Sequence, residues 1–139
     1  MEIIANALQT VAANQNVYFT DTVSCGGCTI LHREGSGLVS LRGITTQARA
    51  RFKITFGGNI AIPTGGTVGA ISLAIALDGE VAPATTMTVT PAAVEEFWNV
   101  FGAIFVDVPH GCCSSISVKN ISTQDVEVQN ANLIIERVA

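Results

Sequence analysis

The residues with the most chemical potential are four cysteines, which occur as two close groups, Cys25-Gly26-Gly27-Cys28 and the adjacent Cys112 and Cys113. Each group has the glycine-rich surroundings of a turn between strands. Three states are open to them: disulfides that link one turn to the other in an oxidising medium, four reduced thiols, or four thiolates around one zinc ion. Thioredoxin-like redox chemistry is not expected, because no βαβ pattern surrounds the first group.

Other signals of catalysis are sparse. The two histidines, His32 and His110, stand outside any recognisable nucleophile, phosphate-loop or zinc-protease motif. Glu95 and Glu96 are neighbours, but adjacent residues of a strand point to opposite faces, so they form a poor acid–base pair. The sequence predicts a protein that is not an enzyme and that needs no cofactor.

Short segments rich in β-branched residues alternate with turn signals along the chain, which is typical of an all-β sandwich. The clearest strand is 49–56, in which charged or polar residues alternate with hydrophobic ones. Segment 70–77 is apolar on both faces and is followed by Asp78-Gly79, a pair suited to a type I′ hairpin turn. We therefore expect both faces of 70–77 to be covered, and the second covered face favours a neighbouring subunit in a trimer.

Segment 97–108 is also apolar on both faces. Its even-numbered residues fit a sandwich core, whereas Phe101 and Phe105 mark the opposite face. A neighbouring subunit would cover that second face, so Phe101, Phe105 and Tyr18 are our candidates for a trimer interface. The final segment, 125–138, changes its hydrophobic phase, which indicates a β-bulge between 129 and 132.

Composition excludes several classes of partner. The 139 residues are 48% hydrophobic and only 13% charged, and the net charge is −4 with a pI of about 4.9. The charged fraction is about half of the usual value for globular proteins. No basic patch is available for nucleic acid or for an anionic membrane, and neither a signal peptide nor a membrane-spanning segment is evident.

The opening segments 5–11 and 17–19, and segment 50–56 with its following apolar strand and Asp-Gly hairpin, resemble trimeric jelly rolls of the tumour-necrosis-factor and complement-head type. The ending, 118–138, resembles the last two strands of domains that cap bacterial collagen-like surface proteins. The resemblance covers nearly the whole chain and is a pattern of strands. It implies one antiparallel two-sheet jelly-roll domain over residues 1–139, assembled as a homotrimer.

The sequence is most similar in character to small proteins of phages and prophages of gut Firmicutes, which implies a head-decoration or head-fibre protein on the outer capsid. The expected partners are other copies of the chain, phage capsid proteins, and host or mucosal glycans. The expected location is the virion surface, after assembly in the host cytoplasm and release by lysis. Two alternatives are a lectin-like tip that binds glycans and a bacterial surface ligand of the tumour-necrosis-factor-like class.

Overall fold

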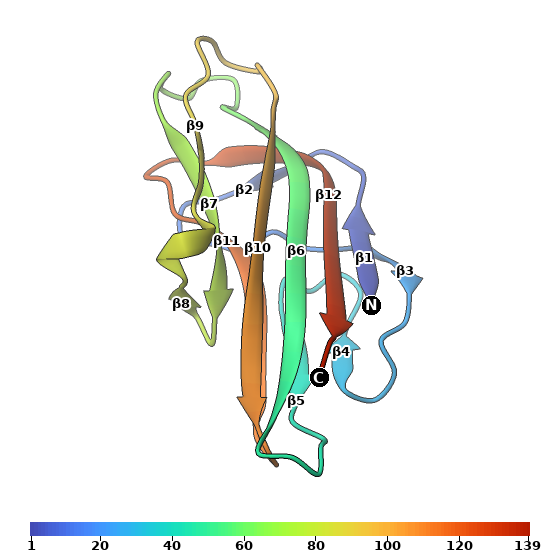
Figure 1. Cartoon of the computed structure of the whole chain (residues 1–139). Helices are drawn as coiled ribbons and strands as arrows, with labels where there is room; N and C mark the ends of the chain where they lie inside the picture. Colours follow the sequence, from blue (N-terminus) through green and yellow to red (C-terminus); the bar gives the residue numbers. More distant parts are fainter.

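The computed structural model describes all 139 residues and consists of two antiparallel sheets packed face to face (Figure 1). The first sheet has the strand order β10-β6-β12-β1-β3, with β2 paired to β12. Its strands are β1 (Glu2–Ala5), β2 (Gln9–Val11), β3 (Asp21–Ser24), β6 (Arg49–Ala61), β10 (Trp98–Pro109) and β12 (Val126–Arg137).

The second sheet has the order β4-β5-β11-β7-β8, with β9 paired to β7. A single 3₁₀ turn, η1 (Pro83–Thr85), connects β8 to β9, and no helix is long and apolar enough to cross a membrane. The strands of this sheet are β4 (Ile30–His32), β5 (Val39–Arg42), β7 (Ile71–Leu77), β8 (Glu80–Val81), β9 (Met87–Val89) and β11 (Cys113–Asn120).

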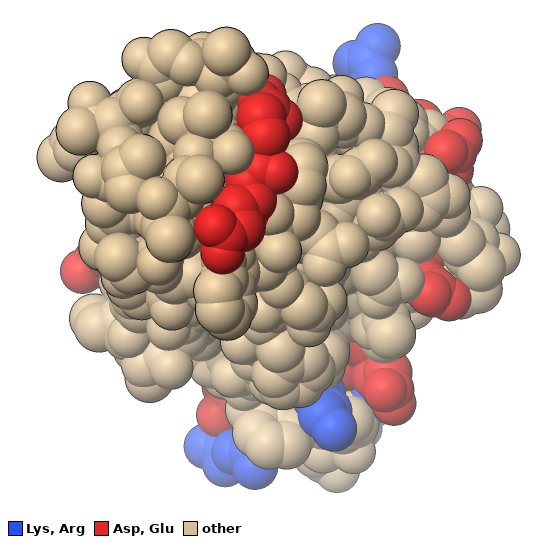
Figure 2. Space-filling view, turned by 90° about the horizontal axis from the view of Figure 1, so that it is seen from above, with Lys and Arg blue, Asp and Glu red and all other residues tan.

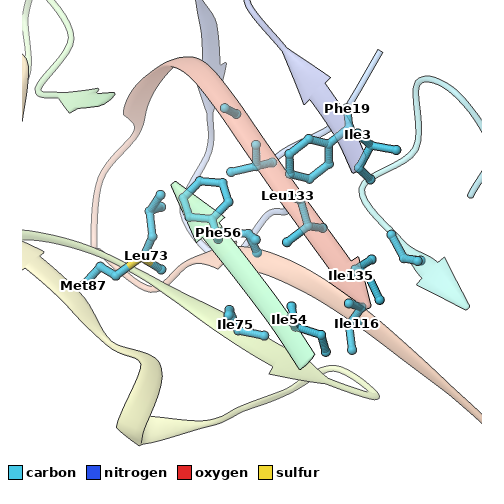
Figure 3. Close-up of a cluster of buried hydrophobic side chains, with 14 of the residues drawn as sticks. Ile3, Phe19, Ile54, Phe56, Leu73, Ile75, Met87, Ile116, Leu133 and Ile135 are labelled. Atoms are coloured by element: carbon cyan, nitrogen blue, oxygen red, sulfur yellow. The ribbon is translucent and has the colours of Figure 1, made fainter. Parts of the chain in front are cut away.

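One hydrophobic cluster of 28 buried residues fills the space between the sheets, so the chain has a single core. Strand β6 shows how the sequence produces it: Phe52, Ile54 and Phe56 are fully buried, whereas the residues between them face outward. Phe56 packs edge-on against Phe19, with ring centroids 6.4 Å apart. Figure 3 shows Ile54 and Phe56 of β6 beside side chains of the second sheet, such as Ile75 and Ile116.

Two local predictions are confirmed. Asp78 and Gly79 both have positive φ, 51° and 86°, as the type I′ hairpin between β7 and β8 requires. The register of β12 against β6 shifts between Gln129 and Asn132, and Asn130 has a φ of 54°. This bulge reverses which residues of β12 face the core, and it explains the change of hydrophobic phase.

The second covered face of β7 needs no neighbouring subunit. Ala74 and Ala76 lie on the outer row of β7, yet both are fully buried within the single chain. They pair with Lys119 and Ser117 of β11, and β8 pairs with Ala76 from the other side. The single chain therefore buries the outer row of β7 by itself, so β7 gives no argument for self-association.

Candidate interaction surface

The most exposed aromatic side chains lie on β10, at one edge of the first sheet. Phe101 is 68% exposed and Phe105 is 60% exposed, with Ala103 between them on the same face. The alternation of the strand causes this, because Val100 and Val106 point into the core. We call Phe101, Ala103 and Phe105 the β10 patch.

The neighbouring strand does little to cover the β10 patch. Phe101 lies opposite Gly57 of β6, and Ala103 lies opposite Thr55. Gly57 has no side chain to place against an aromatic ring. Isolated exposed hydrophobic residues are normal, but two aromatic side chains four residues apart on one sheet face, with Ala103 between them, indicate an interaction surface.

The same sheet face continues across β12 and β1 with partly buried aliphatic residues. Ile134 of β12 lies opposite Thr55, and Glu2 of β1 lies opposite Ile134. Ile4 follows on the same face of β1. These isoleucines lie among polar residues of the same face, such as Thr55, Lys53 and Glu2, so the continuous apolar surface is limited to the β10 edge.

A charged cluster borders the β10 patch toward the ends of β6 and β10. Arg51 lies opposite Asp107, and its Nε and Nη2 donate hydrogen bonds of 2.8 Å and 3.2 Å to the two carboxylate oxygens. Arg49 adds a contact of 3.5 Å to the same carboxylate. The hydrogen bond from Arg51, together with both positive charges, lowers the pKa of Asp107, and the same hydrogen bond raises the pKa of Arg51.

Tyr18 does not join the β10 patch. It lies in the segment between β2 and β3, where its backbone N–H and carbonyl both bond to the side-chain amide of Gln9. The neighbouring Asn16 bridges to β11 of the second sheet. Because β10 and β2 are separated by β6 and β12, the structure divides the three predicted interface residues between two edges of the molecule.

Trp98 differs from its interpretation as a core residue. It is 48% exposed at the start of β10, and its indole N–H donates a 3.0 Å hydrogen bond to Glu96. The alternation of segment 97–108 placed Trp98 with the even-numbered core residues, whereas the structure places it at the exposed start of β10.

All four cysteines are free, exposed thiols. Cys25 and Cys28 lie between β3 and β4, and Cys112 and Cys113 lie where β10 turns into β11. Strand β5 lies between these two regions in the sheet order β4-β5-β11. Because β5 separates the two turns, the structure does not support a disulfide between them. Such a disulfide stays a prediction for the oxidised protein. No group of three or more potential ligand side chains could hold a metal ion, so four thiolates do not converge on a zinc site.

A pair of carboxyl groups that the sequence did not reveal lies near the start of β12. Glu127 is buried there, and its partner is Glu95 of the β9–β10 loop. Burial, and then the hydrogen bond with Glu95, raise the pKa of Glu127, whereas that hydrogen bond lowers the pKa of Glu95. In sequence, Val126-Glu127-Val128 is an ordinary alternating strand, and nothing in it indicates that a loop covers the glutamate.

Solved structures of other proteins share this architecture, although no protein-family model and no curated protein sequence matches the chain. The globular domain of zebrafish complement 1qA protein superposes with a TM-score of 0.61 at 12% identity, over 96% of this chain and 93% of that one. Murine APRIL, from its structure at pH 5.0, superposes with a TM-score of 0.59 at 9% identity, over 95% of this chain and 96% of that one.

The chain is thus an all-β protein with the jelly-roll fold of the C1q and tumour-necrosis-factor-like domains. The superpositions extend over nearly the full length of both chains. At these low identities the likeness establishes the fold and leaves function to be argued from the surface.

Proposed function

We propose that this protein is a non-enzymatic structural protein that assembles into a homotrimeric knob and decorates the outer capsid surface of a bacteriophage. The single observation that carries the assembly is the β10 patch, in which Phe101 and Phe105 are more than half exposed in the isolated chain. Burying such rings against another copy removes apolar surface from water. The assembly therefore has a physical driving force within the chain itself.

The distribution of exposed aromatic residues favours a ring over a two-fold dimer. The β10 patch lies at one edge of the first sheet and Tyr18 lies at the other, 45% exposed. A cyclic trimer joins two different patches on each subunit, whereas a two-fold dimer joins one patch to itself. In such a ring, the β10 patch of one subunit contacts the Tyr18 edge of the next.

The negative net charge of the chain supports a location on the outer surface of a capsid. The net charge of −4 and the scarcity of basic residues suit a body that faces away from the packaged DNA, because a genome-facing protein needs positive charge. Three copies bound at once would strengthen a weak attachment to capsid proteins. In this proposal the protein assembles in the host cytoplasm and leaves on the virion when the cell lyses.

Two measurements test the proposal in sequence. Light scattering of the purified chain at micromolar concentration is expected to give about three times 14.5 kDa, and a stable monomer contradicts the trimer. Antibody labelling of purified phage particles is expected to mark the capsid surface. Protein that is absent from the particles and free in the host cytoplasm contradicts the virion role, whatever its oligomeric state.

A second candidate function, adhesion to host or mucosal glycans, draws support from Trp98. Its ring is exposed, and a carboxylate lies beside it at Glu96, which is a common combination for sugar stacking and hydroxyl recognition. A glycan array probed with the wild type and with Trp98→Ala tests this function. Binding that the variant loses supports adhesion, and an array without any signal contradicts it.

A further inference from the structure

A polar pocket lies where the loops at one end of the sandwich meet. It has a volume of about 690 Å³, and none of the nine residues that line it is hydrophobic. The lining comes from β2, the β6–β7 loop, the β11–β12 loop and the start of β12: Thr10, Pro63, Thr64, Gly65, Gly66, Thr67, Gln124, Asp125 and Glu127. A pocket without aromatic or aliphatic walls is a poor site for an apolar ligand.

The decisive feature of the pocket is Glu127. Only 8% of this residue is exposed, and no N–H or hydroxyl group of the protein donates to its Oε2, so the carboxyl group of Glu95 is its one side-chain partner. Its neighbours across the sheet are Thr10 and Ala61, and neither one donates to it. Two carboxyl groups in contact need a proton or a cation between them, and a buried carboxylate oxygen without a donor is costly.

A second carboxylate is held beside the first. The Oε1 of Glu95 accepts hydrogen bonds of 3.0 Å from both the backbone N–H and the hydroxyl of Thr64, a residue of the pocket wall. The backbone N–H of Glu95 also bonds to the carbonyl of Ile62 at 2.8 Å. These bonds fix Glu95 from the side of the β6–β7 loop, so two carboxyl groups from different elements converge.

No basic side chain neutralises this pair. None of the lining residues is Lys or Arg, and the only salt bridges of the chain are those of Asp107 with Arg49 and Arg51, toward the opposite ends of β6 and β10. Figure 2, which views the molecule from above, shows a continuous acidic stripe with no blue atoms beside it. The positive charge that would balance the pair must come from outside the protein.

We propose that this pocket binds a hydrated hard divalent cation, Mg²⁺ or Ca²⁺, with two carboxylate ligands: Glu127 of its wall, and Glu95, which Thr64 of the wall holds beside it. Every candidate donor in the wall is an oxygen atom, the ligand type that these two ions prefer. Two carboxylates with water in the remaining positions is a usual coordination for Mg²⁺, and the pocket has room for that water. The absence of sulfur and imidazole in the wall disfavours zinc and copper.

The test is a thermal unfolding series on the full chain after treatment with EDTA and dialysis. MgCl₂ and CaCl₂ are each titrated at pH 7, with NaCl at matched ionic strength as the salt control. We expect the melting temperature to rise with at least one divalent ion and to saturate, with a dissociation constant on the order of 10⁻⁴–10⁻³ M. Equal responses to all three salts indicate only screening and overturn the proposal.

Two variants assign the effect to this pocket. Glu127→Gln preserves shape and removes the charge, so it is expected to fold and to lose the divalent response. Glu80→Gln is the matched control on exposed β8, outside the pocket, and is expected to keep it. A Glu127→Gln variant that still responds overturns the site. The proposal is also overturned if neither ion changes the melting temperature of the wild type while Glu127→Gln melts at a higher temperature than the wild type at pH 7. In that case a proton shared by the two carboxyl groups satisfies the pair.

Discussion

Phe101 lies directly opposite Gly57 across the antiparallel pair of β10 and β6. A Cβ atom on Gly57 would meet nothing closer than 3.9 Å, so this position has space that the chain leaves empty. The ring of Phe101 therefore has no cross-strand side chain on β6 to pack against, and 68% of the residue is exposed. Stability of the single chain does not explain this arrangement, and for this reason the proposed assembly places Phe101 at a contact between subunits.

The first prediction concerns this surface. Replacing Phe101 and Phe105 together with serine is expected to convert the proposed trimer to monomers at micromolar concentration, because the exposed rings supply its apolar contact in the proposal. The free energy of unfolding of the monomer is expected to change by no more than about 0.5 kcal/mol per site. Light scattering gives the mass and circular dichroism confirms the fold.

The matched control for this experiment is Leu31→Ser, which replaces another exposed hydrophobic residue, 45% exposed on β4 of the other sheet. This variant is expected to keep the mass of the wild type. A Phe101/Phe105 double variant that remains oligomeric shows that the β10 patch is not the interface. Loss of assembly in Leu31→Ser would move the interface to the second sheet.

The second prediction separates two glycines that look alike in the sequence. A Cβ atom on Gly43 would overlap the backbone carbonyl of Pro109. Two backbone hydrogen bonds also hold Gly43 to the turn after β10: its N–H donates to the carbonyl of Cys112, and its carbonyl accepts from the N–H of Gly111. Backbone on both sides cannot move aside easily, so Gly43→Ala is expected to lower the free energy of unfolding by about 1–3 kcal/mol.

Gly69 is the control, since a Cβ there meets nothing within 4 Å and its φ is not positive. Gly69→Ala is expected to change stability by about 0.5 kcal/mol or less, or to raise it slightly by restricting the unfolded chain. Urea denaturation measures both variants. Equal effects of the two substitutions would mean that the contact between β5 and the turn after β10 does not constrain the fold.

Alternation and turn chemistry were enough to predict much of this fold from sequence. The strand at 49–56, the Asp78-Gly79 turn and the bulge near Asn130 each depend on neighbouring residues in one segment, and all three are present. Such features are local, because the pleat and the permitted φ values already determine them.

The parts that the sequence did not reveal depend on contacts between distant segments. Whether Ala74 is covered depends on its neighbours in β11, 45 residues later, and whether Glu127 is buried depends on the loop that carries Glu95. The position of Tyr18 relative to Phe101 depends on strand order. Periodicity indicates which residues share a face, but it does not indicate which strand lies beside another.

A third prediction follows from the ion pair of Asp107 with Arg51. The pKa of Asp107 is lowered in the folded state, so the pair stabilises the fold above the unfolded pKa of about 4 and loses this effect as the pH falls through the folded value. The wild type is expected to be more stable than Asp107→Asn at pH 6, and the difference is expected to vanish by about pH 2.

Urea denaturation at a series of pH values measures this difference. Because both side chains are partly exposed, high salt is expected to reduce it at pH 6. Asp21→Asn is a control, since Asp21 is exposed on β3 and takes part in no ion pair. A difference between the wild type and Asp107→Asn that stays constant from pH 6 to pH 2 would contradict a charge-based contribution.

The last prediction concerns the state of the cysteines. All four thiols are exposed, and Arg42 of β5 lies between the two groups, paired with Cys113 on one side and donating from Nη1 to the carbonyl of Cys28 on the other. Two strand spacings amount to about 9–10 Å. A disulfide needs Cα atoms within about 7 Å, so a bond across β5 requires backbone movement.

We therefore expect the native protein, purified without reductant and kept from strong oxidants, to react with four equivalents of a maleimide. Intact-mass measurement counts the maleimide adducts per chain, and labelling of the reduced protein in denaturant gives the reference value of four adducts. A native mass four hydrogens below the reduced value, with no labelling, would show that two disulfides form after all. Peptide mapping would then identify their partners, and a bond across β5 would show that this end of the second sheet rearranges on oxidation.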